Sequence, residues 1–182
     1  MAEDQDGRDS KCTFKMKIVS LEEIPAAPYE TPLDNPMRLF AASREMEAIC
    51  RSKGGMGIAA SQLGLPWRFF IYWSDYPSEP GFFDCLVDCE YEPISGNKFK
   101  SVEGCLSIPG RQFELQRYDE ISVFGKRLVV FQDGVKLEEF KENFNGFRAV
   151  VLQHEIDHNY GRERMIDKIG KPIDVSLAWR RS

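Results

Sequence analysis

Both histidines of this 182-residue chain lie in the pentapeptide 154–158, which has the pattern H-E-x-x-H. On a helix, residues four positions apart lie on one face, so His154 and His158 can present two ring nitrogens to one divalent cation. Glu155 then lies beside the metal, where a carboxylate can take a proton from a metal-bound water and pass it to a leaving group. The pattern therefore predicts a hydrolytic metal site. A polar helical turn with two hydrogen-bonded histidines is the alternative.

Two upstream segments carry further groups that such a site can use. Residues 55–62 contain two glycines, which let the backbone approach a ligand closely, followed by two alanines and by Gln62. The side-chain amide of Gln62 is a hydrogen-bond donor. Residues 103–107 place the thiol of Cys105 in a segment that we expect to be a flexible loop.

The three segments together resemble the signature motifs of the peptide deformylase family, from about residue 15 to residue 167 in the same order and spacing. Members of this family are metallohydrolases that remove the formyl group from N-formylmethionine at the start of new polypeptides. The resemblance implies this activity, with formyl-methionyl nascent peptides as the substrate and formate as a product. It also implies an α+β fold in which antiparallel β-sheets pack around a central helix that carries the H-E-x-x-H motif.

The resemblance further implies a metal site with three protein ligands, namely Cys105, His154 and His158, and a water in the fourth position. This is a tetrahedral catalytic arrangement. Fe(II) is the metal that the resemblance implies in cells, but thiolate and imidazole donors would also take Zn(II), Ni(II) or Co(II). Burial is the commonest fate of a free cysteine and is the alternative for Cys105, although the flanking Gly104 and Ser107 are not typical of a core.

By the same resemblance, Glu155 is the general base and acid. The side-chain amide of Gln62 and the backbone N–H of Leu106 would stabilise the negative charge that develops on the formyl oxygen. Capping backbone groups at a strand edge is the alternative for Gln62. Glu103 would hold groups around the metal ligands, and a solvated loop carboxylate is the alternative.

An apolar pocket should accept the methionine side chain of the substrate. Val150 and Val151 lie four and three residues before His154, so helical geometry places them near the metal. The resemblance places these two side chains beside the methionine. Ordinary core packing is the alternative for these two residues. Three further candidates for substrate binding lie in the upstream glycine segment: Met56, Gly57 and Ile58.

The elements before this site should be a strand over 15–21 and a helix. Asp34 or Asn35 can cap this helix, Pro36 fits its first turn, and the glycines after Lys53 should end it. The apolar stripe of the helix is expected to consist of Met37, Phe40, Ala41, Met46, Ile49 and Cys50.

The sequence pattern over residues 67–130 is typical of β-strands, and residues 129–137 are typical of a hairpin that turns at Asp-Gly. Helical spacing resumes at Phe144, and Gly161 is placed to terminate the second helix. Two asparagines are candidate caps for this helix, Asn143 and Asn145. Sheets with one central helix indicate an α+β fold.

The composition fits one compact domain over 1–182, with 42% hydrophobic and 29% charged residues and a flexible lead-in over about 1–12. No apolar run approaches the roughly 20 residues that span a bilayer, so we expect no membrane contact. A net charge of -5 argues against specific nucleic-acid recognition, although the ribosome stays a candidate partner. The N-terminus fits neither a secretory signal nor a transit peptide, which favours the cytoplasm and leaves an organelle or a virus-infected host open.

The five cysteines are odd in number and lack the paired spacing of zinc ribbons, so a disulfide framework is not expected. Cys85 and Cys89 lie in the alternating stretch 83–91. Two residues four positions apart on a strand share one sheet face about 13 Å apart, so we interpret these thiols as strand residues rather than metal ligands.

Two rival functions use the same residues. A zinc-dependent endopeptidase of the H-E-x-x-H type takes its third ligand from downstream, where Glu163 is the nearby candidate. A catalytically inactive, ribosome-associated binding protein could keep the same scaffold, but the intact set of candidate site residues argues against it. The chain also departs from the family at Asn159, where leucine is usual, and we expect looser packing there.

Overall fold

The computed structural model describes residues 16–24, 26, 31–75, 81–161, 165 and 172–173. The helices are α1 (Pro36–Ser52) and α2 (Gly146–Asn159), with short 3-10 turns η1 (Leu21–Glu23) and η2 (Ala60–Leu63). The strands are β1 (Gly57–Ala59), β2 (Phe69–Trp73), β3 (Phe83–Pro93), β4 (Lys98–Cys105), β5 (Ile108–Tyr118), β6 (Glu120–Phe131), β7 (Gly134–Asn145) and β8 (Pro172–Ile173).

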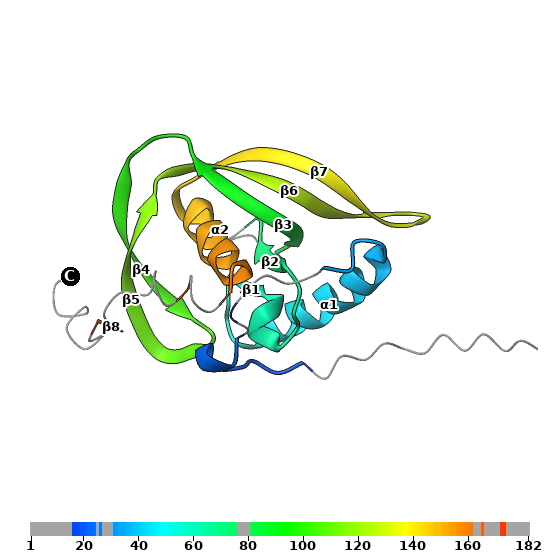
Figure 1. Cartoon of the computed structure of the whole chain (residues 1–182), viewed down its shortest axis with the longest axis horizontal. Helices are drawn as coiled ribbons and strands as arrows, with labels where there is room; N and C mark the ends of the chain where they lie inside the picture. The colour runs from blue at the N-terminus through cyan, green and yellow to red at the C-terminus, as the bar shows by residue number, and fades with distance from the viewer. Residues whose placement is uncertain are drawn as a thin grey trace, which may run out of the picture.

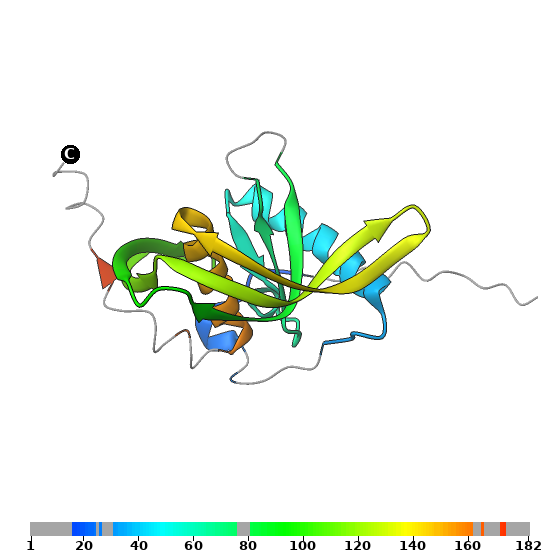
Figure 2. The same cartoon turned by 90° about the horizontal axis from the view of Figure 1, so that it is seen from above.

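These elements form an α+β fold with antiparallel sheets, as expected. One sheet has five strands in the order β1-β2-β3-β6-β7, and the other has three in the order β4-β5-β8. α2 contacts strands of both sheets and lies between them in Figure 1. The β6–β7 hairpin projects beyond the rest of its sheet in both views (Figures 1 and 2).

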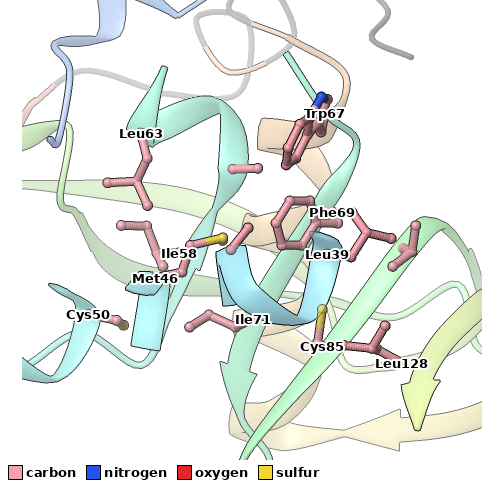
Figure 3. Close-up of a cluster of buried hydrophobic side chains, with 13 residues drawn as sticks. Leu39, Met46, Cys50, Ile58, Leu63, Trp67, Phe69, Ile71, Cys85 and Leu128 are labelled. Atoms are coloured by element: carbon pink, nitrogen blue, oxygen red, sulfur yellow. The ribbon is translucent and has the colours of Figure 1, made fainter. Parts of the chain in front are cut away.

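The five-stranded sheet is covered by α1 on one face and by α2 on the other. Alternate residues of β2 divide between the two sides, since Phe69 and Ile71 pack with α1 while Phe70 and Tyr72 pack with α2. Figure 3 shows the first of these cores, where Leu39 and Met46 of α1 lie beside strand residues such as Phe69 and Ile71. The second core contains Ala149, Leu152 and Ile156, which face the sheet from α2.

α1 begins and ends where the sequence predicts. The side chain of Asn35 accepts a hydrogen bond of 3.0 Å from the backbone N–H of Arg38, and Pro36 occupies the first helical turn. The expected apolar stripe is wrong in part, because Met37 is 55% exposed and Leu39 is fully buried. The side chains that α1 buries are Leu39, Ala42, Ser43, Met46 and Cys50.

The strand expected over 15–21 is wrong in the described part, since residues 16–20 have no strand partner and Leu21 begins η1. One backbone bond, from Val19 N–H to the Gln62 carbonyl, holds this segment instead. A hydrogen bond of 2.9 Å from the Ser20 backbone N–H to the Glu23 carboxylate favours the turn.

The hairpin and the second helix are confirmed with shifted boundaries. β6 and β7 are joined by Gln132 and Asp133, one position before the expected Asp-Gly turn. β7 continues through Asn145, so Phe144 is a strand residue and α2 begins only at Gly146. Gly161 ends the helix as predicted, with a positive φ of 92°.

Cys85 and Cys89 lie on opposite faces of β3, so the expectation of a shared face is wrong. Cys85 packs in the α1 core and Cys89 in the α2 core. The register of β3 against β6 shifts between Val87 and Glu90, and Asp88 there has a positive φ of 49°. A β-bulge inserts one residue and reverses the alternation of side chains beyond it.

Some predictions fall on residues that the structure does not describe. The lead-in over about 1–12 and the rival ligand Glu163 lie outside the described residues, as does most of the segment after Gly161. Among the described helices, none combines the length and apolar character that crossing a bilayer requires.

Candidate metal and catalytic site

A cleft of about 1610 Å³ is lined by residues of β1, β4, β5 and α2. In the described part of the chain, β1 is an edge of the five-stranded sheet and β4 an edge of the three-stranded sheet. The cleft exceeds the roughly 300–1,000 Å³ of common small-molecule pockets. Two sheet edges beside one large cleft suit an extended peptide, because edge backbone groups can pair with an added strand.

Three potential metal donors converge in this cleft. The ligand atoms of Cys105, His154 and His158 lie within 4.8 Å of one another. Cys105 and His158 are buried, and the side chain of His154 is 12% exposed. Sγ of Cys105 lies 3.3 Å from Nε2 of His158. The two histidines lie one turn apart on α2, and Cys105 is the last residue of β4 rather than part of the expected flexible loop.

A buried ion cluster supports the first histidine. The Glu103 carboxylate accepts hydrogen bonds of 2.7 and 2.8 Å from Arg117, and its Oε2 lies 2.9 Å from Nδ1 of His154. Arg117 also donates to Asp157 at 2.6 Å, and its side chain is 1% exposed. Glu103 is therefore no solvated loop carboxylate. Its bond to Nδ1 leaves Nε2 of His154 for the metal site.

The two histidines lie in different electrostatic surroundings. Burial acts to lower the pKa of His154, but its hydrogen bonds with Cys105 and Glu103 raise that pKa well above the ordinary value. Burial and the charge of His154 lower the pKa of His158 well below its ordinary value. The surroundings therefore favour positive charge at His154 and disfavour it at His158. One thiolate and two imidazoles are the donor set of a catalytic transition-metal site.

Glu155 lies beside these donors with one carboxylate oxygen uncommitted. Its side chain is buried, and Oε2 has no hydrogen-bond partner among the described residues. Burial raises the pKa of the Glu155 carboxyl to about 7, with the nearby His154 opposing the shift. A carboxyl group with a pKa near neutrality can both accept and return a proton.

Gln62 is buried on η2 with its amide orientation fixed. The backbone N–H of Ala59 donates to its Oε1 at 2.9 Å, which leaves Nε2 directed at Ser107 Oγ (3.3 Å) and Cys105 Sγ (3.5 Å). Only the side-chain oxygen of Gln62 caps a backbone group, as the strand-edge alternative predicts. The side-chain nitrogen does not. The Gln62 N–H donors face the same space as the candidate metal ligands.

The candidate substrate-binding residues divide into two groups. Val150 and Val151 line the cleft from α2, and Met56 and Gly57 line it from the start of β1. Leu106, the candidate backbone donor, lines it from the turn after β4. Ile58 differs from the expectation, since its side chain is fully buried in the α1 core. Side chains alternate along a strand, so a strand that presents Gly57 to the cleft turns its next residue away.

Arg117 and Asp157 are the site residues that sequence reasoning missed. A signal for Arg117 existed, because it follows Phe113 and Leu115 at the inward positions of β5. An arginine at an inward strand position needs buried acidic partners. Asp157 lies on α2 between the two histidines, where the H-E-x-x-H pattern permits any residue.

The order of these motifs agrees with a family comparison. Residues 24–172 match the sequence model of the family described as polypeptide deformylase. The chain belongs to this family. Deformylases are metal-dependent hydrolases that act on nascent formyl-methionyl peptides, and removal of the N-formyl group is accordingly the activity of this chain.

Curated relatives and solved structures agree with the family. The chain is 32% identical to "Peptide deformylase 2" of Streptomyces avermitilis over 85% of its own length and 75% of the relative's. It is 33% identical to "Peptide deformylase 2" of Bordetella bronchiseptica, covering 76% of this chain and 74% of the relative. The crystal structure of peptide deformylase from Thermotoga maritima superposes with a TM-score of 0.68 at 26% identity, covering 87% of this chain and 100% of that one. A probable peptide deformylase from synechococcus phage S-SSM7 gives a TM-score of 0.63 at 25% identity, over 79% and 93% of the two chains.

Proposed function

We propose that the cleft beside α2 is the deformylation site, in which Cys105, His154 and His158 hold one divalent ion. The observation that carries this proposal is the convergence of these three donors within 4.8 Å. α2 serves as the central helix of one catalytic domain over 1–182. Fe(II) is the metal in cells, and Zn(II), Ni(II) or Co(II) can take its place on the same donors. The protein acts in the cytoplasm on formyl-methionyl chains that emerge from the ribosome.

Glu155 moves the proton that the hydrolysis requires. When bound, the ion acts as a Lewis acid that polarises the formyl carbonyl and makes water more acidic. The carboxylate of Glu155 removes a proton from the attacking water as the water oxygen bonds to the formyl carbon. As the carbon–nitrogen bond breaks, Glu155 returns the proton to the methionine nitrogen. Formate and a free amino terminus are the products, and Glu155 regains its charge.

Gln62 stabilises the negative charge on the former formyl oxygen, together with the backbone N–H of Leu106. The amide of Gln62 is held by Ala59 before the substrate arrives, so no reorientation is needed during the reaction. Loss of one such donor typically slows the chemical step about 100- to 1,000-fold.

The substrate peptide lies extended between the edges of β1 and β4. Backbone groups of Gly57 and Gly104 on these edges line the cleft, and Gly104 has no side chain to obstruct an approaching peptide. The methionine side chain packs against Val150, Val151 and Met56. Ile58 contributes its backbone alone.

Formate release from a formyl-Met peptide by the anaerobically prepared, iron-loaded protein tests the proposal. Glu155→Gln should lower kcat by about 100- to 10,000-fold while the metal content is retained. Glu138→Gln removes a carboxylate on β7, outside the cleft lining, and is the matched control. A metal-loaded protein that releases no formate would instead favour the inactive binding protein.

Cys105→Ser distinguishes the proposed site from that of a zinc endopeptidase. The substitution removes a thiolate ligand, so metal bound per chain should fall. Unchanged metal occupancy would mean that the third ligand lies elsewhere, as the endopeptidase hypothesis predicts.

A further inference from the structure

The cleft has positively charged side chains that the proposed chemistry does not use. Lys53 follows α1 and precedes β1, and Arg111 lies on β5 of the other sheet. Both line the cleft and are exposed at its mouth. In the part of the chain that the structure describes, neither forms an ion pair with a carboxylate. Their charges are available to a ligand that enters between the two sheets.

A third cation, Lys100, lines the same cleft from β4. Its Nζ lies 2.8 Å from Oε1 of Glu114, with 68% and 43% of the two side chains exposed. Exposed ion pairs of this kind contribute little and exchange readily with other partners. Lys100 can therefore also turn to an anionic group in the cleft.

The acidic side chains that line the cleft do not cancel these charges. Glu103 is committed to Arg117 and His154 inside the ion cluster, and Glu155 lies buried at the reaction centre. Asp119 is the remaining carboxylate along the cleft lining. Among the lining side chains, Lys53, Lys100 and Arg111 therefore outnumber the one remaining carboxylate, although the whole chain has a net charge of -5.

Arg111 and Lys100 flank the path of a peptide that runs back along β4 from Cys105. The backbone oxygen of Arg111 lies 3.9 Å from a Cβ built on Gly104, directly before the candidate ligand Cys105. Lys100 lies four residues back along β4 from Gly104, about 13 Å for an extended strand. An extended peptide covers this distance with about four residues. Its second to fourth residues would thus pass the positive side chains.

We infer that this enzyme prefers formyl-methionyl peptides that carry an acidic side chain within the first few residues after methionine. This preference rests on the proposed function, since it assumes that the formyl group is processed beside Cys105. Complementary charge at the rim of a site mainly increases the rate of productive encounter. Exposed pairs of this kind are expected to change kcat/KM by about two- to tenfold in total.

Matched peptides test the preference. Glu, Gln or Lys is placed singly at residue 2, 3 or 4 of one formyl-Met peptide, and kcat/KM for formate release is measured with the iron-loaded protein. Glu should exceed Gln about two- to tenfold in at least one position, and Lys should fall below Gln. The Glu-to-Gln ratio should approach one as salt rises, because screening shortens the range of the attraction.

Variants test whether the named cations cause the preference. Arg111→Gln and Lys53→Gln should each lower the Glu-to-Gln ratio, and Arg111→Glu should favour the Lys peptide. Because each ratio compares peptides on one protein, a loss of folded protein does not change it. Lys136→Gln on β7, outside the cleft lining, should keep the original ratio.

Two outcomes separate the inference from the function on which it rests. Equal kcat/KM values for the three peptides at every position would overturn the charge preference and leave deformylation intact. Failure of the metal-loaded protein to release formate from any of the peptides would contradict the proposed function, and the preference with it.

Discussion

The carboxylate of Glu155 packs directly against the backbone of Gly57. A Cβ built on Gly57 would lie 2.7 Å from Oε1 and 2.9 Å from Cγ of Glu155. Cβ atoms do not approach other heavy atoms this closely, so any side chain at residue 57 displaces the carboxylate. The glycine on β1 thus sets the position of the proposed proton carrier on α2.

Gly57→Ala should lower kcat by about a hundredfold, since a shift of about 1 Å in a reacting group has an effect of this size. The metal content should stay close to that of the parent protein, because the three heavy atoms nearest to the new Cβ all belong to Glu155 and not to a candidate ligand. Gly96→Ala is the control, with no heavy atom within 4 Å of its new Cβ. A fully active Gly57→Ala protein would show that Glu155 does not need this position.

Arg117→Met should destabilise the fold by about 3–5 kcal/mol, because it leaves the buried carboxylates of Glu103 and Asp157 without their cation. Urea unfolding measures this difference. Arg44→Met breaks an ion pair with Glu47 in which the arginine is 65% exposed, and it should cost less than about 1 kcal/mol. Similar losses in both variants would contradict the role of Arg117 as the buried cation that compensates two carboxylates.

Acid should weaken the metal-free fold through Glu103. Burial would raise the pKa of this carboxyl, but hydrogen bonds from Arg117 and His154 lower it to about 2 from an ordinary 4.5. A lowered pKa in the folded state means that the stabilisation is complete above about pH 4.5 and disappears as the pH falls toward 2. Glu103→Gln should make the free energy of unfolding depend less steeply on pH in this window. Identical slopes for the two proteins would assign the acid sensitivity to other groups.

Asn159→Leu should stabilise the protein. Asn159 is fully buried, and neither atom of its side-chain amide has a hydrogen-bond partner within the described residues. An unsatisfied buried polar group typically costs about 1–3 kcal/mol, so a leucine of similar size should raise the free energy of unfolding by that order. Asn143→Leu on exposed β7 should change it by less than about 0.5 kcal/mol. A destabilised Asn159→Leu protein would indicate that the amide has a partner after all.

Features of the fold that depend on neighbouring residues could be predicted from the sequence. The start of α1 depends on Asn35 and Pro36, and the end of α2 depends on the positive φ of Gly161. The burial on α1 was harder to predict. Met37 and Leu39 are both apolar, and only the packing of the sheet against one side of the helix leaves Met37 in solvent.

Features that depend on residues distant in the sequence could not be predicted from the local sequence pattern. The faces of Cys85 and Cys89 depend on a bulge that forms against β6. Arg117 meets Asp157 across 40 positions of sequence, so neither residue reveals the other. For the candidate site, the motifs identify the residue types, whereas the orientation of the Gln62 amide by Ala59 is visible only in three dimensions.

The candidate ligands come from two different parts of the molecule. Cys105 ends a strand of the small sheet, while both histidines lie on the helix that covers the large one. A metal ion held by all three would act as a cross-brace between the two sheets. The ion would then add its binding free energy to folding, so a chelator should both stop the reaction and lower the melting temperature.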